Sequence, residues 1–204
     1  MSARDRILGR IGGVLGDRAV PAADDYAAID RSYLVRHHDD GIVDLFAERT
    51  ADYRATVRKV PAAGLPGAIA GALTGARYAV PDGLPAAWLA GVDPSRLVTD
   101  PDVAGLEAVD GVVTACAVAV AETGTIVLDH GPGQGRRALT LVPDRHLIVV
   151  AAGQIVPDVP EALARLDPLR PLTLVSGPSA TSDIELNRVE GVHGPRSLEV
   201  IIAL

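Results

Sequence analysis

Glu122, Thr123 and Gly124 make a polar break between two apolar runs, residues 118–121 and 126–128. A carboxylate at such a break can serve as a general base or as a nucleophile. The same residues also fit a plain turn, in which Glu122 caps backbone amides and Gly124 supplies a positive φ. Since no second carboxylate lies nearby in the sequence, spacing alone favours the turn, and a catalytic Glu122 is a hypothesis.

A second polar segment, "SGPSATSDIE" at residues 176–185, follows the apolar run 172–175. Gly177 allows a sharp turn and Pro178 prevents the strand from continuing. The spacing from Ser182 to Glu185 is that of a capping box, which predicts a short helix beginning near Ser182. A strand, a glycine turn and a hydroxyl-rich helix start can bind a small anion, although turn and capping chemistry alone also accounts for the pattern.

Histidine and arginine supply the other candidates. His193 stands in "GVHGP" and could orient a ligand or act as an acid or base near neutral pH, or merely bond a carbonyl. Arg136 and Arg137 follow a glycine-rich stretch, residues 131–135, that lacks both the P-loop ending and the dinucleotide spacing. Paired arginines can clamp a carboxylate or phosphate, but a solvated helix face explains them as well.

Composition excludes several classes of function. The chain has 204 residues and a net charge of −7, with no cluster of Lys and Arg, so we expect no nucleic-acid partner. No apolar run is long enough for a membrane span and the start lacks a signal-peptide core, which predicts a cytoplasmic protein without membrane insertion. The histidines are too scattered for a metal site, and the single Cys116 cannot hold an iron–sulfur cluster. We therefore expect no cofactor and no metal.

Hydrophobic periodicity indicates the elements that position these residues. The segment 2–16 reads as a short helix with Ile7 and Ile11 on its apolar stripe, followed by an irregular arm to about residue 40. From residue 41 helical and strand patterns alternate, ending in strands near 146–152, 172–177 and 197–204. This order predicts an α/β fold, a single domain over 41–204 with a mostly parallel sheet flanked by helices. Ligands would then bind at the carboxyl ends of the strands.

Four C-terminal motifs in order, "AETGTIVLD", "SGPSATSDIE", "GVHGP" and "LEVIIAL", resemble the LUD-domain family. The resemblance extends to "RDRILGRIGGVLG" and "DLFAERTADYRATVRKV" and so covers nearly the whole chain. It implies a fold like the NagB, ribose-5-phosphate isomerase and CoA-transferase group. The residues that match the family's motifs are Glu122, Thr123, Gly124, Gly177, Pro178, Ser179, Thr181, Asp183, Glu185, Gly191, His193, Gly194 and Pro195. The glycine-rich insert departs from the family pattern and weakens the transfer of a ligand-binding role to Arg136.

The resemblance implies a subunit that oxidises L-lactate to pyruvate together with two cysteine-rich iron–sulfur proteins and has no redox centre of its own. An alternative stays open, a stand-alone CoA-transferase-like or sugar-phosphate-type enzyme. In that alternative Glu122 is base or nucleophile, and the loop at 177–183 holds a small anionic ligand. A scaffold whose turns are only turns is a third interpretation.

Overall fold

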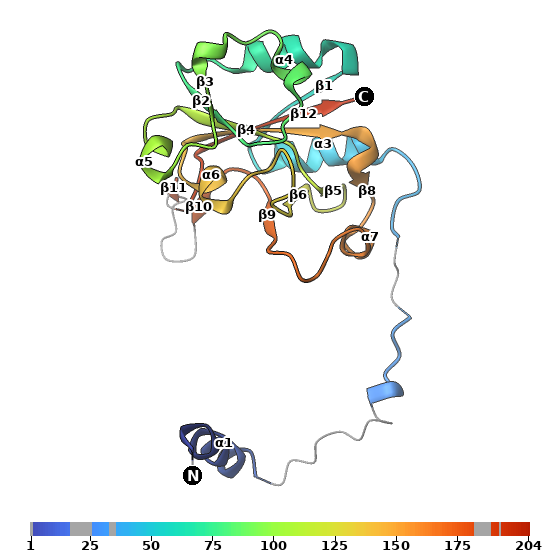
Figure 1. Ribbon diagram of the computed structural model, residues 1–204. Helices are drawn as coiled ribbons and strands as arrows, with labels where there is room; N and C mark the ends of the chain where they lie inside the picture. Colours follow the sequence, from blue (N-terminus) through green and yellow to red (C-terminus); the bar gives the residue numbers. More distant parts are fainter. Residues whose placement is uncertain (1, 17–25, 33–35, 182–188, 192) are drawn as a thin grey trace. The chain divides into compact units, whose positions relative to one another are not determined.

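The computed structural model describes residues 2–16, 26–32, 36–181, 189–191 and 193–204. It divides into two compact units, residues 1–34 and 35–204, the second of which we call the body (Figure 1). The sequence placed this division at residue 40. The structure assigns residues 36–40 to the body, because side chains at 36–38 are bonded to it.

The N-terminal unit contains α1 (Ala3–Leu15), close to the helix that the sequence predicts. Ser2 and Asp5 form a capping box at its start: the Ser2 side chain accepts from the Asp5 amide at 3.1 Å and the Asp5 carboxylate accepts from the Ser2 amide at 2.9 Å. No residue of α1 is buried, so Ile7 and Ile11 are exposed. That this stripe docks on a partner stays a prediction.

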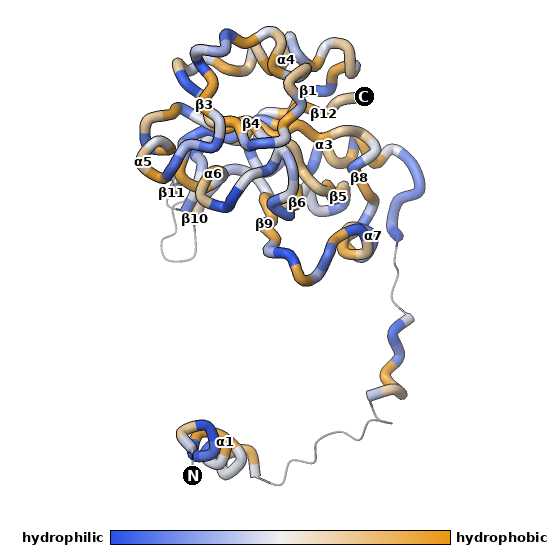
Figure 2. Tube along the Cα trace, viewed as in Figure 1, coloured by the Kyte–Doolittle hydropathy of each residue, from blue (hydrophilic) through white to orange (hydrophobic). Residues whose placement is uncertain are grey.

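The body is built around a six-stranded sheet in the order β1-β12-β7-β4-β2-β3, in which all neighbouring strands are parallel. This confirms the α/β class with a mostly parallel sheet. Hydrophobic residues predominate along the strands at the middle of the body, as Figure 2 shows. The strands are β1 (Thr56–Val60), β2 (Tyr78–Val80), β3 (Leu97–Thr99), β4 (Gly111–Thr114), β7 (Arg145–Ala151) and β12 (Ser197–Ala203).

Helices and a second sheet cover the two faces of this sheet. Alternate residues of β7 point to opposite faces, so Leu147 and Val149 pack with α4 while Ile148 and Val150 pack with α3. The face with Ile148 also receives α6 and the second sheet. The α-helices of the body are α3 (Ile42–Asp52), α4 (Leu65–Ala72), α5 (Val103–Leu106), α6 (Arg137–Leu141) and α7 (Val159–Ala164). The described residues of the body also form the 3₁₀ turns η1 (Ala62–Gly64), η2 (Ala86–Leu89), η3 (Pro94–Arg96) and η4 (Ala152–Gln154).

The second sheet has the order β8-β5-β6-β9 and is mostly antiparallel. Its strands are β5 (Val118–Val120), β6 (Thr125–Leu128), β8 (Ile155–Val156) and β9 (Thr173–Val175). The segment 112–129, which the sequence predicts to be a strand or two around a break, forms β4 of the main sheet and β5 and β6 of this sheet. Glu122 therefore follows a strand of the second sheet and not a strand of the main parallel sheet.

A short antiparallel pair, β10 (Ala180–Thr181) and β11 (Val189–Glu190), follows β9. The helix that the sequence predicts to begin near Ser182 lies outside the described residues, as do Asp183 and Glu185.

Candidate functional site

A cavity of about 310 Å³ lies between β9 with the loop that follows it, α6, and the turn before β12. We call it the β9 cavity. Its walls combine hydroxyl, histidine and arginine side chains with leucine and proline. The lining residues are 137, 140–141, 146, 173–180, 193–195 and 198.

The loop of the β9 cavity is fixed by a close approach and by three hydrogen bonds. Gly177 has φ +85°, and a Cβ there would lie 2.5 Å from the Cβ of Tyr53 and 2.8 Å from its carbonyl oxygen. The Ser179 amide donates to the Pro195 carbonyl at 2.8 Å, and the Ser179 carbonyl accepts from the Gly191 amide at 3.0 Å. The Ser179 hydroxyl accepts from the His193 amide at 3.2 Å. The loop and the histidine turn thus hold each other in place.

His146 lies in the floor of the cavity, on the face of β7 that also carries Ile148. Its side chain is only 3% exposed, and burial lowers its pKa to about 3, so the imidazole is neutral at pH 7. One ring nitrogen, Nε2, lies 2.8 Å from the Thr114 hydroxyl on β4. Arg137, the first residue of α6, also lines the cavity and is exposed.

Glu122 sits in the tight turn between β5 and β6. Gly124 closes this turn with φ +59°, and a Cβ there would meet the backbone of Arg49 and Thr50 at 2.8 and 2.9 Å. The Glu122 amide donates to the Pro157 carbonyl at 3.0 Å. The Glu122 carboxylate lies 2.6 Å from Nε2 of His38, and both side chains are 37% exposed.

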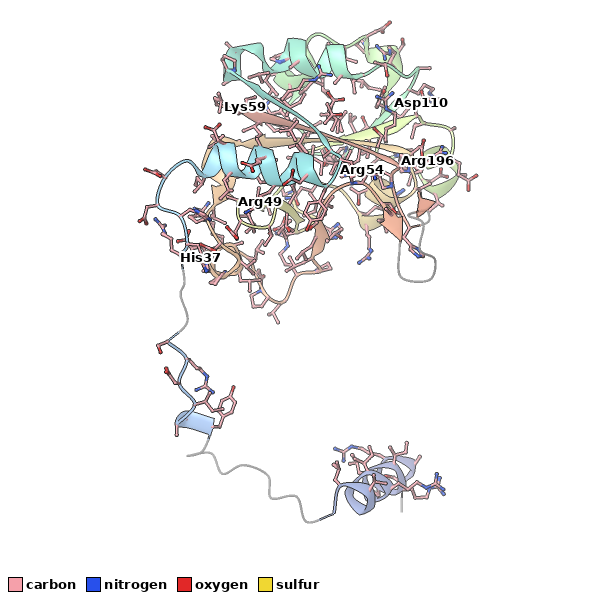
Figure 3. The ribbon with its side chains drawn as sticks, turned by 180° about the vertical axis from the view of Figure 1, so that it is seen from behind. His37, Arg49, Arg54, Lys59, Asp110 and Arg196 are labelled. Carbon is pink, nitrogen blue, oxygen red and sulfur yellow. The ribbon has the colours of Figure 1, made fainter. Side chains whose placement is uncertain are left out.

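Residues 36–38 bind three carboxylates in succession, and we call them the clasp segment. The Arg36 guanidinium meets Glu161 at 2.7 Å, His37 binds Asp158, and His38 binds Glu122. Asp158 accepts from both the amide and Nδ1 of His37, each at 2.6 Å. Figure 3 labels His37 at this edge of the body.

The pKa of Asp158 results from opposing causes. Burial of the carboxylate, which is 4% exposed, raises the pKa. The hydrogen bonds from His37 and the nearby charges of His37 and His38 together outweigh burial and hold the pKa below its ordinary value of 3.8.

A row of hydroxyls joins the Glu122 turn to the wall of the β9 cavity. Thr123 donates to the Thr125 hydroxyl at 2.8 Å, and the Thr125 hydroxyl lies 2.8 Å from that of Ser176. Ser176 lines the cavity, whereas Glu122, Thr123 and Gly124 are not among its lining residues.

The structure brings Gly177, Pro178, Ser179 and His193 together around the β9 cavity. Thr181 lies in β10, and Asp183 falls outside the described residues. Arg136 lines a separate hollow of about 480 Å³, with Asp82 and Asp100, and its guanidinium donates to the carbonyl of Pro101. The functional roles proposed for all these residues stay predictions.

Arg137 and His146 also line the cavity. The sequence indicates Arg137 only as one of a pair of arginines, and it gives His146 no role. The period of two along 145–151 was a usable signal, because it places His146 on the same face as Ile148 and Val150.

No group of His, Cys, Asp and Glu within the described residues could hold a metal ion. Cys116 is 3% exposed, and burial raises the pKa of its thiol to about 12. In the part of the chain that the structure describes, no helix is both long and apolar enough to cross a membrane.

Comparison with known proteins places this architecture in a family. The family model "LUD domain" matches residues 103–203, and the chain is 54% identical over 167 residues to lactate utilization protein C of Deinococcus radiodurans. That match covers 79% of each chain. The protein belongs to the LUD-domain family.

The LUD match runs from the first residue of α5 to the last residue of β12, and so includes the Glu122 turn and the β9 cavity. The crystal structure of a DUF162 family protein from Deinococcus radiodurans has a TM-score of 0.68 and 45% identity to this chain. The structural match covers 80% of this chain and 96% of the DUF162 family protein. Lactate utilization protein C of Geobacillus sp. (strain WCH70) is 35% identical over 98 residues, 44% of this chain and 40% of the relative.

Proposed function

We propose that this protein is a subunit of an L-lactate utilization system that oxidises L-lactate to pyruvate together with two cysteine-rich iron–sulfur proteins. The observation that carries the proposal is the 54% identity to lactate utilization protein C over 167 residues. In this proposal the chain has no redox centre of its own and acts by binding substrate or by organising its partners.

The cysteine content supports this division of labour. An iron–sulfur cluster takes about four thiolates, and the chain has only Cys116. Burial keeps that thiol protonated at neutral pH. In this proposal the electrons from lactate pass to iron–sulfur clusters on the partner chains. We place the complex in the cytoplasm, in keeping with the sequence analysis.

The alternative of a stand-alone CoA-transferase-like or sugar-phosphate-type enzyme requires Glu122 to face a bound substrate as base or nucleophile. The Glu122 carboxylate is instead paired with His38. The resemblance to the NagB, ribose-5-phosphate isomerase and CoA-transferase group stays a prediction about the fold, and no observation of the site favours this second function.

Genetic complementation tests the proposal. The gene is introduced into a bacterium that lacks lactate utilization protein C, and growth on L-lactate as sole carbon source is compared with growth on pyruvate. We expect growth on L-lactate to be restored while growth on pyruvate is unchanged. Soluble protein without restored growth would contradict the proposal.

A reconstituted mixture tests the partner requirement. We expect the purified chain to be colourless and unable to oxidise L-lactate, and the mixture with both iron–sulfur proteins to reduce an artificial electron acceptor. A bound flavin or cluster spectrum in the purified chain, or lactate oxidation by the chain alone, would overturn the assignment.

A further inference from the structure

The charge of the β9 cavity is unusual for this chain. Among the described residues, its walls carry Arg137, two histidines and four side-chain hydroxyls, but no Asp or Glu. The chain as a whole has 26 acidic and 19 basic residues. A cavity that excludes carboxylates in an acidic protein is suited to an anion.

Three hydrogen-bond donors or acceptors of the cavity have no protein partner in the described part of the chain. The Arg137 guanidinium makes no hydrogen bond or ion pair there. Ser179 accepts from the His193 amide and so retains its own hydroxyl hydrogen for another acceptor. His146 uses Nε2 for Thr114, which leaves Nδ1 unpartnered although the residue is 3% exposed. A ligand bound in the cavity would supply a partner for each of these three groups.

The chemistry of these groups selects a ligand. An arginine fork matches the two oxygens of a carboxylate, and a serine hydroxyl can add a third hydrogen bond. The neutral imidazole of His146 offers either one N–H or one lone pair, which suits a hydroxyl better than a full charge. Leu141 and Leu198 supply a short apolar wall, and about 310 Å³ is the lower end of the range for small organic ligands.

We propose that the β9 cavity binds a small 2-hydroxy carboxylate, with Arg137 and Ser179 on the carboxylate and His146 on the hydroxyl. The inference rests on the proposed function in its choice of acid, for which L-lactate is the probe. It assigns a ligand-binding role to Arg137 and His146, which lie outside the four C-terminal motifs of the family.

Calorimetric titration of the purified full chain with L-lactate tests the proposal. We expect saturable binding, a loss of at least about tenfold in affinity for Arg137→Gln, and a similar loss for propionate, which lacks the hydroxyl. Inorganic phosphate, titrated in parallel, should bind more weakly than L-lactate. Tighter binding of phosphate than of L-lactate, or equal binding of propionate and L-lactate, would overturn the assignment.

The neighbouring arginine is the matched comparison. Arg136→Gln removes the same charge one residue away, from a side chain that contacts Pro101 in the other hollow. We expect Arg136→Gln to bind L-lactate as the unaltered chain does. Loss of binding in Arg136→Gln alone would support the prediction from the sequence and refute the role of Arg137.

His146→Gln should reduce the preference for L-lactate over propionate, with circular dichroism as the check on folding. If this buried substitution prevents folding, the propionate comparison in the unaltered chain tests the same contact. Restored growth without L-lactate binding would refute the role of the β9 cavity and leave the proposed function intact. Binding of L-lactate without restored growth would refute the proposed function and leave the role of the cavity intact.

Discussion

The clasp around Glu122 and the β9 cavity are both polar, but they satisfy their polar groups in opposite ways. At the clasp, Arg36, His37 and His38 each meet a carboxylate, so the charges are compensated within the protein. In the cavity, Arg137 and Nδ1 of His146 have no partner among the described residues. A compensated cluster stabilises the fold, whereas an uncompensated one is suited to a ligand. Only the cavity has polar groups available to bind a ligand.

The largest effect should come from changing the cavity loop itself. In Gly177→Ala the new Cβ meets Tyr53 in a backbone conformation with φ +85°, and we expect the free energy of unfolding to fall by about 3 kcal/mol. Denaturant unfolding followed by circular dichroism measures it. Gly71→Ala in α4 is the control, because nothing lies within 4 Å of its Cβ position. Equal stability of the two variants would show that the loop is not held against Tyr53.

A smaller effect is expected at the clasp. Asp158→Asn removes a buried carboxylate bonded by His37, and should lower the free energy of unfolding by about 1.5 kcal/mol near neutral pH. Because the folded-state pKa of Asp158 lies below 3.8, its contribution is complete above pH 4 and is lost as the pH falls through that pKa.

Unfolding measured from pH 7 to pH 3 should therefore show the difference between Asp158→Asn and the unaltered chain shrink below pH 4. Asp39→Asn, whose carboxylate is 94% exposed, should change little at any pH. A difference that grows towards low pH would mean that the carboxylate opposes folding, contrary to the view of the clasp as stabilising.

The smallest effect on stability should be at Glu122. Since Glu122 and His38 are each 37% exposed, Glu122→Gln and His38→Gln should each lower the free energy of unfolding by less than about 1 kcal/mol. We expect Glu122→Gln, but not His38→Gln, to slow growth on L-lactate in the complemented strain. If both variants support growth on L-lactate as well as the unaltered chain does, Glu122 has a structural role in the clasp and no role in function. The distinction between the two regions would then be sharper.

The sequence predicts the central strands of the main sheet well because each has a clear apolar run. Residues 147–150 and 200–202 are apolar on both faces, as is usual for a central parallel strand. The division of residues 112–128 between two sheets is not predictable in the same way. Almost every residue there is buried, so the pattern has no alternation that would mark where the chain leaves one sheet for the other.

The site was only partly predictable for a related reason. The loop at 177–179 and His193 carry local turn signals, and these identified one wall of the cavity. The partner of Glu122, His38, lies 84 residues away and is set by tertiary structure alone. His146 is not predictable as a site residue, because a single polar residue in an apolar strand is usually structural. Whether it faces a cavity depends on which other elements pack against that face of β7.

The hydroxyl row between Thr123 and Ser176 has a consequence for communication between the two regions. Each hydroxyl carries one hydrogen, so when Thr123 donates to Thr125, Thr125 can turn its hydrogen from the Thr123 carbonyl, 3.4 Å away, to Ser176, and Ser176 can point its hydrogen into the cavity. An anion there would favour this direction for all three O–H dipoles, each polarising the next. Occupancy would then be transmitted to the residue beside Glu122 as a reorientation of protons, with no backbone displacement. Heavy-atom coordinates alone would not register the signal, but neutron diffraction would.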